Sequence, residues 1–239
     1  MTRKSISSLV ALSLLMFVGA ETAHPPMKYL AQDDVNFIAL LPEPPTKGSA
    51  EQKAEIQQIL AIQATRTKDD EARAKREEKF EVFQFAGIVG EGFTAEKCPL
   101  TAAMFKTLET DSKYFSRTAK EHWDHPRPPY VNAEIKPCVT LENEGSYPSG
   151  HATRGMLFAL VLAEVFPEHR AELLEQGRQV GWDRVVGGVH YPSDVAAGRV
   201  LGQALAAKLM SKPAFQADFE QVKAELKSLE ARPTAMNVK

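Results

Sequence analysis

Apolar residues recur at helical spacing through most of this chain, and this periodicity limits the possible folds more than any other feature. Steps of three or four residues place each series on one face of a helix, and that face has to be buried against a neighbour. The clearest series are Leu100, Met104, Leu108, Phe115 and Ala119, and, near the C-terminus, Phe215, Phe219, Val222, Leu226 and Leu229. No segment shows the alternation expected of a half-buried strand. The sequence therefore predicts an all-α protein, a single-domain helical bundle.

Capping signals indicate where several helices begin. The candidates, in chain order, are Ser49, Ser149, Pro167 and Ser193. Ser49 opens the sequence S-A-E-Q, a capping-box pattern. A helix is expected to start near Ser149, and Ser193 is expected as an N-cap. Proline suits a helix first turn because that position needs no N–H donor. Gly198 and Gly202 lie on the helix expected after Ser193, where the absence of side chains would let a neighbouring helix pack closely.

The first twenty residues differ from the rest of the chain. Arg3 and Lys4 precede an apolar run from Ile6 to Ala20, a layout typical of a secretory signal peptide. A cut after Ala20 fits better than one after Ala23, which would place Glu21 three residues before the cut. The alternative is an uncleaved anchor, but a spanning helix needs about 20 predominantly apolar residues and this run is shorter. We therefore predict a signal peptide over residues 1–20, export to the periplasm, and no stable membrane anchor afterwards.

Residues 21–48 are rich in proline, which disfavours regular helix. We expect an extended N-terminal arm that lies on the domain and is anchored by Phe37, Ile38, Leu40 and Leu41. The helical domain is expected to occupy residues 49–239. Oligomeric state stays open, although the apolar part of the arm, residues 30–45, could serve an interface.

Charge argues against a nucleic-acid-binding protein. The formal net charge is −2, from 29 basic and 31 acidic residues, whereas nucleic-acid-binding domains are usually strongly basic. Residues 68–81 hold five basic and six acidic side chains, so their charges cancel. That stretch is interpreted as a solvated helix with ion pairs along it.

Three short segments concentrate the residues that can carry chemistry. They are K-E-H-W-D-H-P-R-P at residues 120–128, Y-P-S-G-H at 147–151 and R-V-V-G-G-V-H-Y-P-S-D at 184–194. Taken singly each is weak, because a lone arginine is usually a surface charge and a lone histidine is usually structural. Together they contain a lysine, two arginines, two histidines, and a Ser-Gly pair where a helix is expected to begin.

This combination suits the binding of a phosphoryl group. Arginine matches phosphate oxygens in bidentate geometry, and lysine acts as a compact point charge. Backbone N–H groups at a helix N-terminus attract an anion, and glycine lets the anion approach the backbone. Asp194, four residues beyond His190, could hold one ring nitrogen and leave the other free to attack.

The three segments resemble the signature of the type 2 phosphatidic acid phosphatase superfamily. That signature is Lys, six residues, Arg-Pro; then Pro-Ser-Gly-His; then Ser-Arg, five residues, His, three residues, Asp. Lys120 and Arg127, Arg184 and His190, and His190 and Asp194 stand at those spacings. Within the superfamily the chain is most similar to the soluble class A bacterial acid phosphatases, from Leu40 to the C-terminal helix. The resemblance implies a helical bundle like those of the superfamily and of vanadium haloperoxidases.

The resemblance also implies a reaction and a role for each residue. His190 would attack phosphorus and form a phosphohistidine, Asp194 would orient His190, and His151 would protonate the leaving group. The implied phosphate-binding residues are Lys120, Arg127, Ser149, Gly150 and Arg184. The substrates would be small phosphate monoesters with broad specificity. No metal or other cofactor would be needed, and transfer to an alcohol instead of water would be a possible side activity.

One position departs from the signature. The superfamily has serine before the arginine of the third segment, and this chain has Asp183. That serine has no assigned chemical role, so catalysis should survive. Asp183 could pair with a nearby cation and tune Arg184, or it could face solvent.

Two rival functions remain open from sequence. A metal-dependent phosphoesterase could use the H-W-D-H segment, in which His122, Asp124 and His125 are potential ligands. A vanadate-dependent haloperoxidase would use similar anion-binding residues. A serine hydrolase centred on Ser149 fits poorly, because the nucleophile elbow requires glycine where Tyr147 stands.

The chain has two cysteines, Cys98 and Cys138. If the protein is exported it reaches an oxidising compartment, where disulfides persist. We therefore expect these two cysteines to form a disulfide, the alternative being two buried free thiols.

Overall fold

The structure is a computed structural model that describes residues 26–230. Within that range every regular element is helical, which confirms the predicted all-α class. The α-helices are α1 Phe37–Leu40, α2 Ala50–Thr65, α3 Lys68–Arg76, α4 Ala86–Val89, α5 Pro99–Trp123, α6 Pro128–Val131, α7 Gly150–Ala163, α8 Arg170–Val186, α9 Pro192–Met210 and α10 Pro213–Glu230. Three 3₁₀ turns, η1 Glu77–Lys79, η2 Val82–Phe85 and η3 Pro167–His169, connect some of them.

The predicted signal peptide lies outside the described residues and stays a prediction. Among residues 26–230, no helix combines the length and apolarity needed to cross a bilayer.

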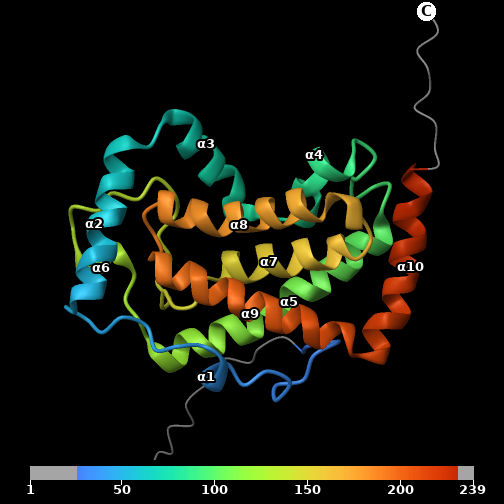
Figure 1. The fold of residues 1–239 in the computed structure, drawn as a ribbon, viewed down its shortest axis with the longest axis horizontal. Helices are drawn as coiled ribbons and strands as arrows, with labels where there is room; N and C mark the ends of the chain where they lie inside the picture. The colour runs from blue at the N-terminus through green and yellow to red at the C-terminus, as the bar shows by residue number, and fades with distance from the viewer. Residues whose placement is uncertain (1–25, 231–239) are drawn as a thin grey trace, which may run out of the picture.

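Helices α7, α8 and α9 form the centre of the bundle and run side by side in Figure 1. Glycines allow this close packing. A Cβ at Gly198 or Gly202 of α9 would lie 2.5 Å from the Ser149 carbonyl oxygen or 2.4 Å from that of Thr153. Such distances are sterically impossible, so α9 can lie this near to α7 only with glycine at both positions. This contact, expected from the sequence, also brings the start of α9 to the start of α7.

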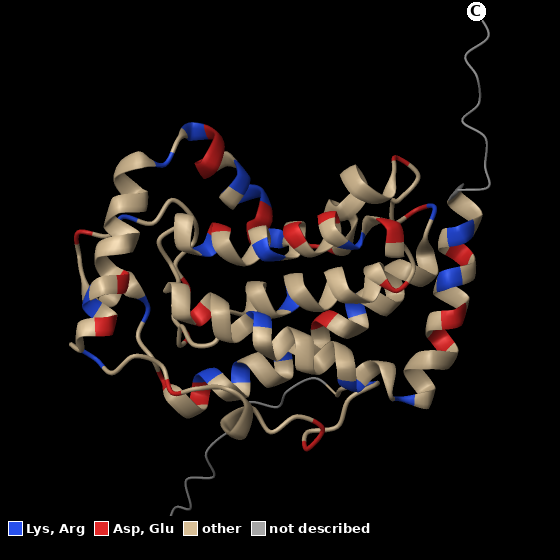
Figure 2. Cartoon of the chain, in the orientation of Figure 1, with Lys and Arg blue, Asp and Glu red and all other residues tan. Residues whose placement is uncertain are grey.

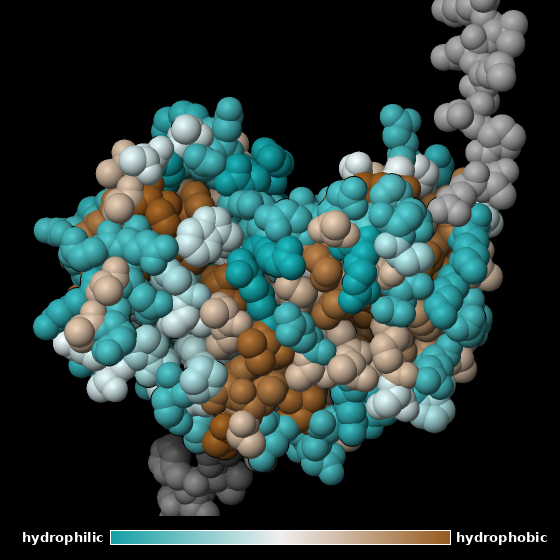
Figure 3. Space-filling model, viewed as in Figure 1, coloured by the Kyte–Doolittle hydropathy of each residue, from teal (hydrophilic) through white to brown (hydrophobic). Residues whose placement is uncertain are grey.

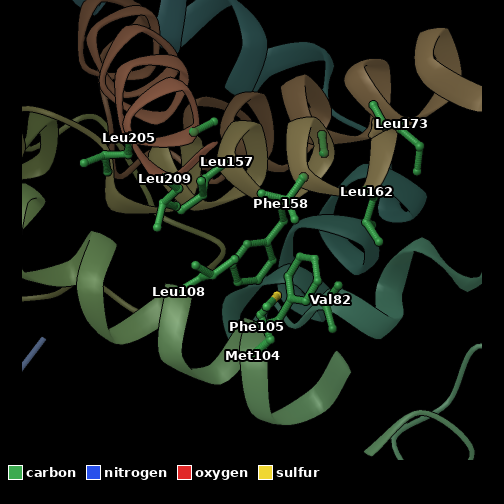
Figure 4. Packing of buried hydrophobic residues seen from close by; sticks show 14 of the residues in the cluster. Val82, Met104, Phe105, Leu108, Leu157, Phe158, Leu162, Leu173, Leu205 and Leu209 are labelled. Carbon is green, nitrogen blue, oxygen red and sulfur yellow. The ribbon is translucent and has the colours of Figure 1, made fainter. Parts of the chain in front are cut away.

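The main core lies between the central helices and α5, with α10 closing one end of the bundle (Figures 1 and 4). Phe105 of α5 packs edge-on against Phe158 of α7, with ring centroids 4.9 Å apart. In α10, four residues of the predicted stripe are buried: Phe215, Phe219, Val222 and Leu226. The stripe on α5 is confirmed except at Leu100, which is 46% exposed. Its backbone N–H instead donates to the Glu225 carboxylate of α10, which covers the end of α5.

The helix starts agree with the sequence only in part. Helix α7 starts at Ser149, its N-cap, where a helix start was predicted, and Ser49 caps α2 by accepting a hydrogen bond from the Gln52 N–H. Ser193 is not an N-cap: Tyr191 holds that position, because Pro192 already occupies the first turn of α9.

The described part of the arm, residues 26–48, lies along the domain as expected, but it contains the short helix α1. Three consecutive backbone N–H groups of the arm, at residues 28–30, donate to the buried Asp111 carboxylate of α5. Of the four predicted anchors, Leu41 is buried and Phe37 packs on the core, whereas Ile38 and Leu40 are exposed.

The surface carries charges of both signs and one apolar area in the view of Figures 2 and 3. Both α3 and α10 carry basic and acidic positions, coloured blue and red on the ribbon in Figure 2. Apolar atoms gather over α1 and α9 (Figure 3), where Leu40 and Val200 are exposed and Ala204 and Ala207 line a shallow groove. The expectation that the arm could serve an interface stays open.

Candidate active site

The three chemical segments meet at one end of the central helices, around a cavity of about 350 Å³. Lys120 comes from the last turn of α5, and Arg127 from the turn that follows it. Arg184 lies in the last turn of α8, and Asp194 in the first turn of α9. The cavity wall includes Lys120, Gly150, His151 and His190.

His190 and Asp194 form a buried pair. The Nδ1 atom of His190 lies 3.0 Å from Oδ2 of Asp194, and both side chains are almost inaccessible to solvent. Asp194 Oδ2 also accepts hydrogen bonds from the Ser146 hydroxyl and from the Tyr191 N–H. Because the carboxylate holds the proton on Nδ1, Nε2 keeps its lone pair. The contact on which the predicted role of Asp194 depends is present, and the role itself stays a prediction.

The surroundings favour a neutral imidazole at His190. Burial lowers the pKa of His190 well below its usual 6.5, and Arg127, Lys120 and Arg184 lower it further. Burial raises the pKa of Asp194 to about 7, while its bonds with Ser146 and the Tyr191 N–H oppose that rise. A neutral imidazole is the form that can act as a nucleophile.

Three buried cations surround this histidine. Arg127 is fully buried, and its Nη1 lies 3.1 Å from Nε2 of His190. Lys120 is 5% exposed, and its ammonium group contacts the Glu144 carboxylate. Arg184 is also buried, and its Nε and Nη1 atoms have no hydrogen-bond partner. Unpaired guanidinium donors in a buried position are costly, so Arg184 is suited to an anion that enters the cavity.

The N-terminus of α7 completes the anion site. Ser149 donates its backbone N–H to the Asp194 carbonyl oxygen at 2.9 Å, which joins the starts of α7 and α9. A Cβ at Gly150 would meet only the Ser116 hydroxyl, at 3.6 Å, so its absence leaves room beside the helix end. The free N–H groups of that first turn attract negative charge.

His151 follows Gly150 in the cavity wall. Its Nε2 lies 3.2 Å from the Glu78 carbonyl oxygen. Burial lowers the pKa of His151 well below 6.5, and Arg184 and Arg154 add to that effect. Of the eight predicted site residues, four line the cavity: Lys120, Gly150, His151 and His190. Arg127 and Asp194 are buried behind it and contact His190, and Ser149 and Arg184 are buried as well.

Comparison with known proteins identifies the family of this chain. Residues 101–216 match the model of the PAP2 superfamily. An acid phosphatase of Zymomonas mobilis is 31% identical over 92% of this chain and 86% of its own length. The chain belongs to the PAP2 superfamily. The resemblance to type 2 phosphatidic acid phosphatases is thereby confirmed.

Two further comparisons differ in how much of each chain they cover. A non-specific acid phosphatase of Salmonella typhimurium is 39% identical, over 59% of this chain and 59% of its own length. A bacterial vanadium-dependent iodoperoxidase is similar in structure, with a TM-score of 0.59 and 16% identity, over 77% of this chain and 54% of that one. The second likeness shows the fold alone, and it confirms the expected PAP2 and haloperoxidase architecture.

Asp183, which departs from the PAP2 signature, is buried and paired. Its carboxylate accepts two hydrogen bonds from Arg73 of α3, at 2.8 and 3.0 Å, and one from Gln179 at 2.8 Å. Glu77 lies beside it, and burial raises the pKa of Glu77 to about 8, with Asp183 as the next cause. The segment 68–81 is thus more than a solvated helix with ion pairs along it, because it packs its Arg73 and Glu77 side chains against α8.

Glu77→Gln should make stability less dependent on pH. The folded pKa of Glu77, about 8, lies above its ordinary 4.5, so the folded state retains a proton that the unfolded chain releases. The wild type should therefore lose free energy of unfolding as pH rises from about 5 to 8, by roughly 3–5 kcal/mol. The glutamine side chain of the variant is neutral at every pH, so its free energy of unfolding should not fall in this way. Urea unfolding at several pH values measures it, with the exposed Glu91→Gln as control. Parallel pH curves for wild type and Glu77→Gln would refute the assignment.

Four residues at or near the cavity were not recognised from the sequence. Glu142 and Glu144 pair with the predicted cations, Ser146 bonds Asp194, and Arg154 lines the cavity. Two signals could have pointed to them. The E-N-E-G-S stretch directly precedes Tyr147 of the second segment, and residue 154 stands one helical turn beyond Gly150.

The H-W-D-H segment is arranged differently from a metal site. The ring of His122 lies near those of Phe37 and Trp123. The ring of His125 is buried near Tyr191, on another side of the turn that begins at the left-handed residue Asp124. The two histidines therefore lie in different surroundings. Among the described residues, no group of three potential ligands is placed to hold a metal ion.

The predicted disulfide is wrong. Cys98 and Cys138 are both free thiols. Cys98 is buried at the start of α5 and packs in the main core, whereas Cys138 lies in the loop after α6 and packs against a separate small cluster. The 25 residues of α5 run between them, so closeness to the first chemical segment in sequence does not bring the two sulfurs together.

Proposed function

We propose that this PAP2 protein is an acid phosphatase that hydrolyses small phosphate monoesters through a phosphohistidine on His190, without a metal ion. One observation carries the proposal. A histidine that Asp194 contacts at Nδ1, and whose Nε2 faces an Arg127 donor, stands among three buried cations, one of which has unfilled donors. The acid phosphatases of Zymomonas and Salmonella, similar to this chain, support the same reaction class.

In the first step, His190 Nε2 would form a bond to phosphorus while the ester oxygen leaves. Lys120, Arg127 and Arg184, with the Ser149 side chain and the Gly150 N–H, would hold the phosphoryl oxygens. Phosphoryl transfer needs mainly positioning and charge stabilisation, which these groups supply. Asp194 would stabilise the positive charge that appears on His190. In the second step, water attacks phosphorus and gives a proton to His151, the N–P bond breaks, and phosphate leaves.

His151 is proposed as the acid that protonates the leaving oxygen. Its low pKa means that it is neutral in the empty cavity at neutral pH. A bound phosphate dianion would raise that pKa, and acidic solution would supply the proton. Turnover should therefore be best at acidic pH.

Broad specificity is proposed because the named residues would all hold the phosphoryl group, which every phosphomonoester shares. An alcohol that replaced water in the second step would accept the phosphoryl group. Export to the periplasm, which depends on a signal peptide at residues 1–20, remains part of the proposal. The division of the rest of the chain into an arm at residues 21–48 and a helical domain at residues 49–239 is proposed as well.

The test is an assay with a chromogenic phosphomonoester at pH 5 to 8. Hydrolysis should be fastest at the acidic end and should persist in excess EDTA, because three side-chain cations supply the charge. Vanadate should inhibit, since it can adopt the five-coordinate geometry of the transition state. Loss of activity in EDTA that Zn²⁺ or Mg²⁺ restores would contradict the metal-free mechanism. Absence of hydrolysis at every pH would contradict the function.

A further inference from the structure

Two of the three cations of the proposed phosphate site already have carboxylate partners in the empty cavity. Arg127 Nη2 lies 2.6 Å from the Glu142 carboxylate and 3.5 Å from that of Glu144. The ammonium group of Lys120 contacts Glu144 as well, and Arg117 lies 3.9 Å from it. Both glutamates come from the loop between α6 and α7, so one short segment neutralises two of the three buried cations.

The two glutamate side chains are placed so that they can turn away from the cations into solvent. Their side chains are 42% and 38% exposed, whereas the cations that they contact are nearly or fully buried. Moving the carboxylates into solvent would not release Arg127 from its position. Its Nε still donates to the Glu144 carbonyl oxygen at 3.1 Å, and its Nη1 to that of Val189 at 3.2 Å. Only Nη2 would become free for a new partner.

A phosphate dianion can replace this pair. It carries comparable charge, and it adds contacts that the glutamates do not make. These are the unfilled Nε and Nη1 donors of Arg184 and the N–H groups at the start of α7. Burial acts to raise the pKa of Glu144, but Lys120 and Arg127 hold it below its ordinary value, so the carboxylate is ionised and competes as an anion.

We propose that Glu142 and Glu144 are internal competitors for the phosphate site, which hold Lys120 and Arg127 in the empty enzyme, turn outward when a phosphoryl group binds, and return as product phosphate leaves. The proposal rests on the proposed function, because it takes the same cations as the phosphate site. If Glu142 and Glu144 compete in this way, they determine the affinity for substrate and the strength of inhibition by product phosphate. The chemistry recognised is that of inorganic phosphate and of the terminal phosphoryl group of a monoester.

The test is the binding of inorganic phosphate to the full chain, measured by calorimetry. The Glu142→Gln/Glu144→Gln double variant should bind phosphate at least ten times more tightly than the wild type. The inhibition constant for phosphate and the KM of a chromogenic substrate should fall in parallel. The single variant Glu144→Gln should show part of the effect. Glu81→Gln is the matched control, because Glu81 lines the same cavity and makes no ion pair with Lys120 or Arg127.

Two results would overturn the proposal while the proposed function stands. One is an active wild type whose phosphate affinity is not increased by the double variant. The other is an equal gain in Glu81→Gln, which would mean that only the overall charge of the cavity matters. A phosphate-bound crystal structure gives a direct check: both carboxylates should have left the two cations, and their persistence there would also overturn it. If wild type and variants neither hydrolyse the substrate nor bind phosphate, the proposed function fails and the competitor role fails with it.

Discussion

His190→Ala should lower kcat for a chromogenic phosphomonoester by roughly 10⁴-fold or more, because it removes the only atom placed to attack phosphorus in the proposed reaction. The ring is buried and neutral, and its Nε2 lies within 3.1 Å of Arg127, so water in the same cavity would have no comparable activation. The wild type, quenched during turnover of a radiolabelled substrate, should carry phosphate that is stable to alkali and labile to acid. The variant should carry none.

The control for this prediction is His169→Ala. His169 lies in η3, outside the cavity wall, so its loss should change kcat by less than about twofold. Turnover by His190→Ala within tenfold of the wild type would rule out His190 as the nucleophile.

Asp194→Asn should lower kcat by about 10³- to 10⁴-fold, the size of effect expected when a carboxylate that sets a catalytic tautomer is replaced by an amide. The asparagine can donate its N–H₂ group to Nδ1, which would move the ring proton to Nε2 and block attack. Asp194 contacts His190, Ser146 and the Tyr191 N–H but none of the three cations. The affinity for inorganic phosphate should therefore change little while kcat collapses.

Glu55→Gln is the matched control for that variant. Glu55 is another carboxylate at the start of α9, where it accepts hydrogen bonds from the Ser193 N–H at 2.6 Å and hydroxyl at 2.9 Å. Its loss disturbs the same helix turn without touching His190. If Glu55→Gln and Asp194→Asn lower kcat equally, the effect of Asp194 is structural and the tautomer argument is wrong.

The sequence predicted the parts of the site that depend on short spacings. His190 and Asp194 stand four residues apart across the start of one helix, and Ser149 and Gly150 adjoin within another, so local geometry brings each pair together. The glycines at 198 and 202 likewise predicted a close helix contact that the structure contains. The motif could not indicate that Lys120 and Arg127 are paired with carboxylates. Glu142 and Glu144 belong to a loop whose path depends on the packing of α5 and α7.

Longer-range contacts decided what the sequence left open or what was predicted wrongly. Asp183 meets Arg73 across 110 residues of sequence, and no local pattern distinguishes that arginine from its charged neighbours on α3. A disulfide between the two cysteines was predicted because an exported protein reaches an oxidising compartment. The two cysteines instead lie in separate apolar clusters. Leu100 continues an apolar stripe but is exposed, and its backbone N–H bonds the Glu225 carboxylate of α10.

By itself, the sequence determined the helical class of this protein, its superfamily and the identity of the residues around His190, since apolar periodicity and motif spacing are properties of consecutive residues. The tertiary structure alone decided which of those groups face one another and with what charge. It left donors of Arg184 empty, placed two loop carboxylates on Lys120 and Arg127, and buried Asp183 against Arg73. The physical reason is that burial and ion pairing depend on distances in space, which the packing of α3, α5, α7 and α8 sets and which local sequence does not encode.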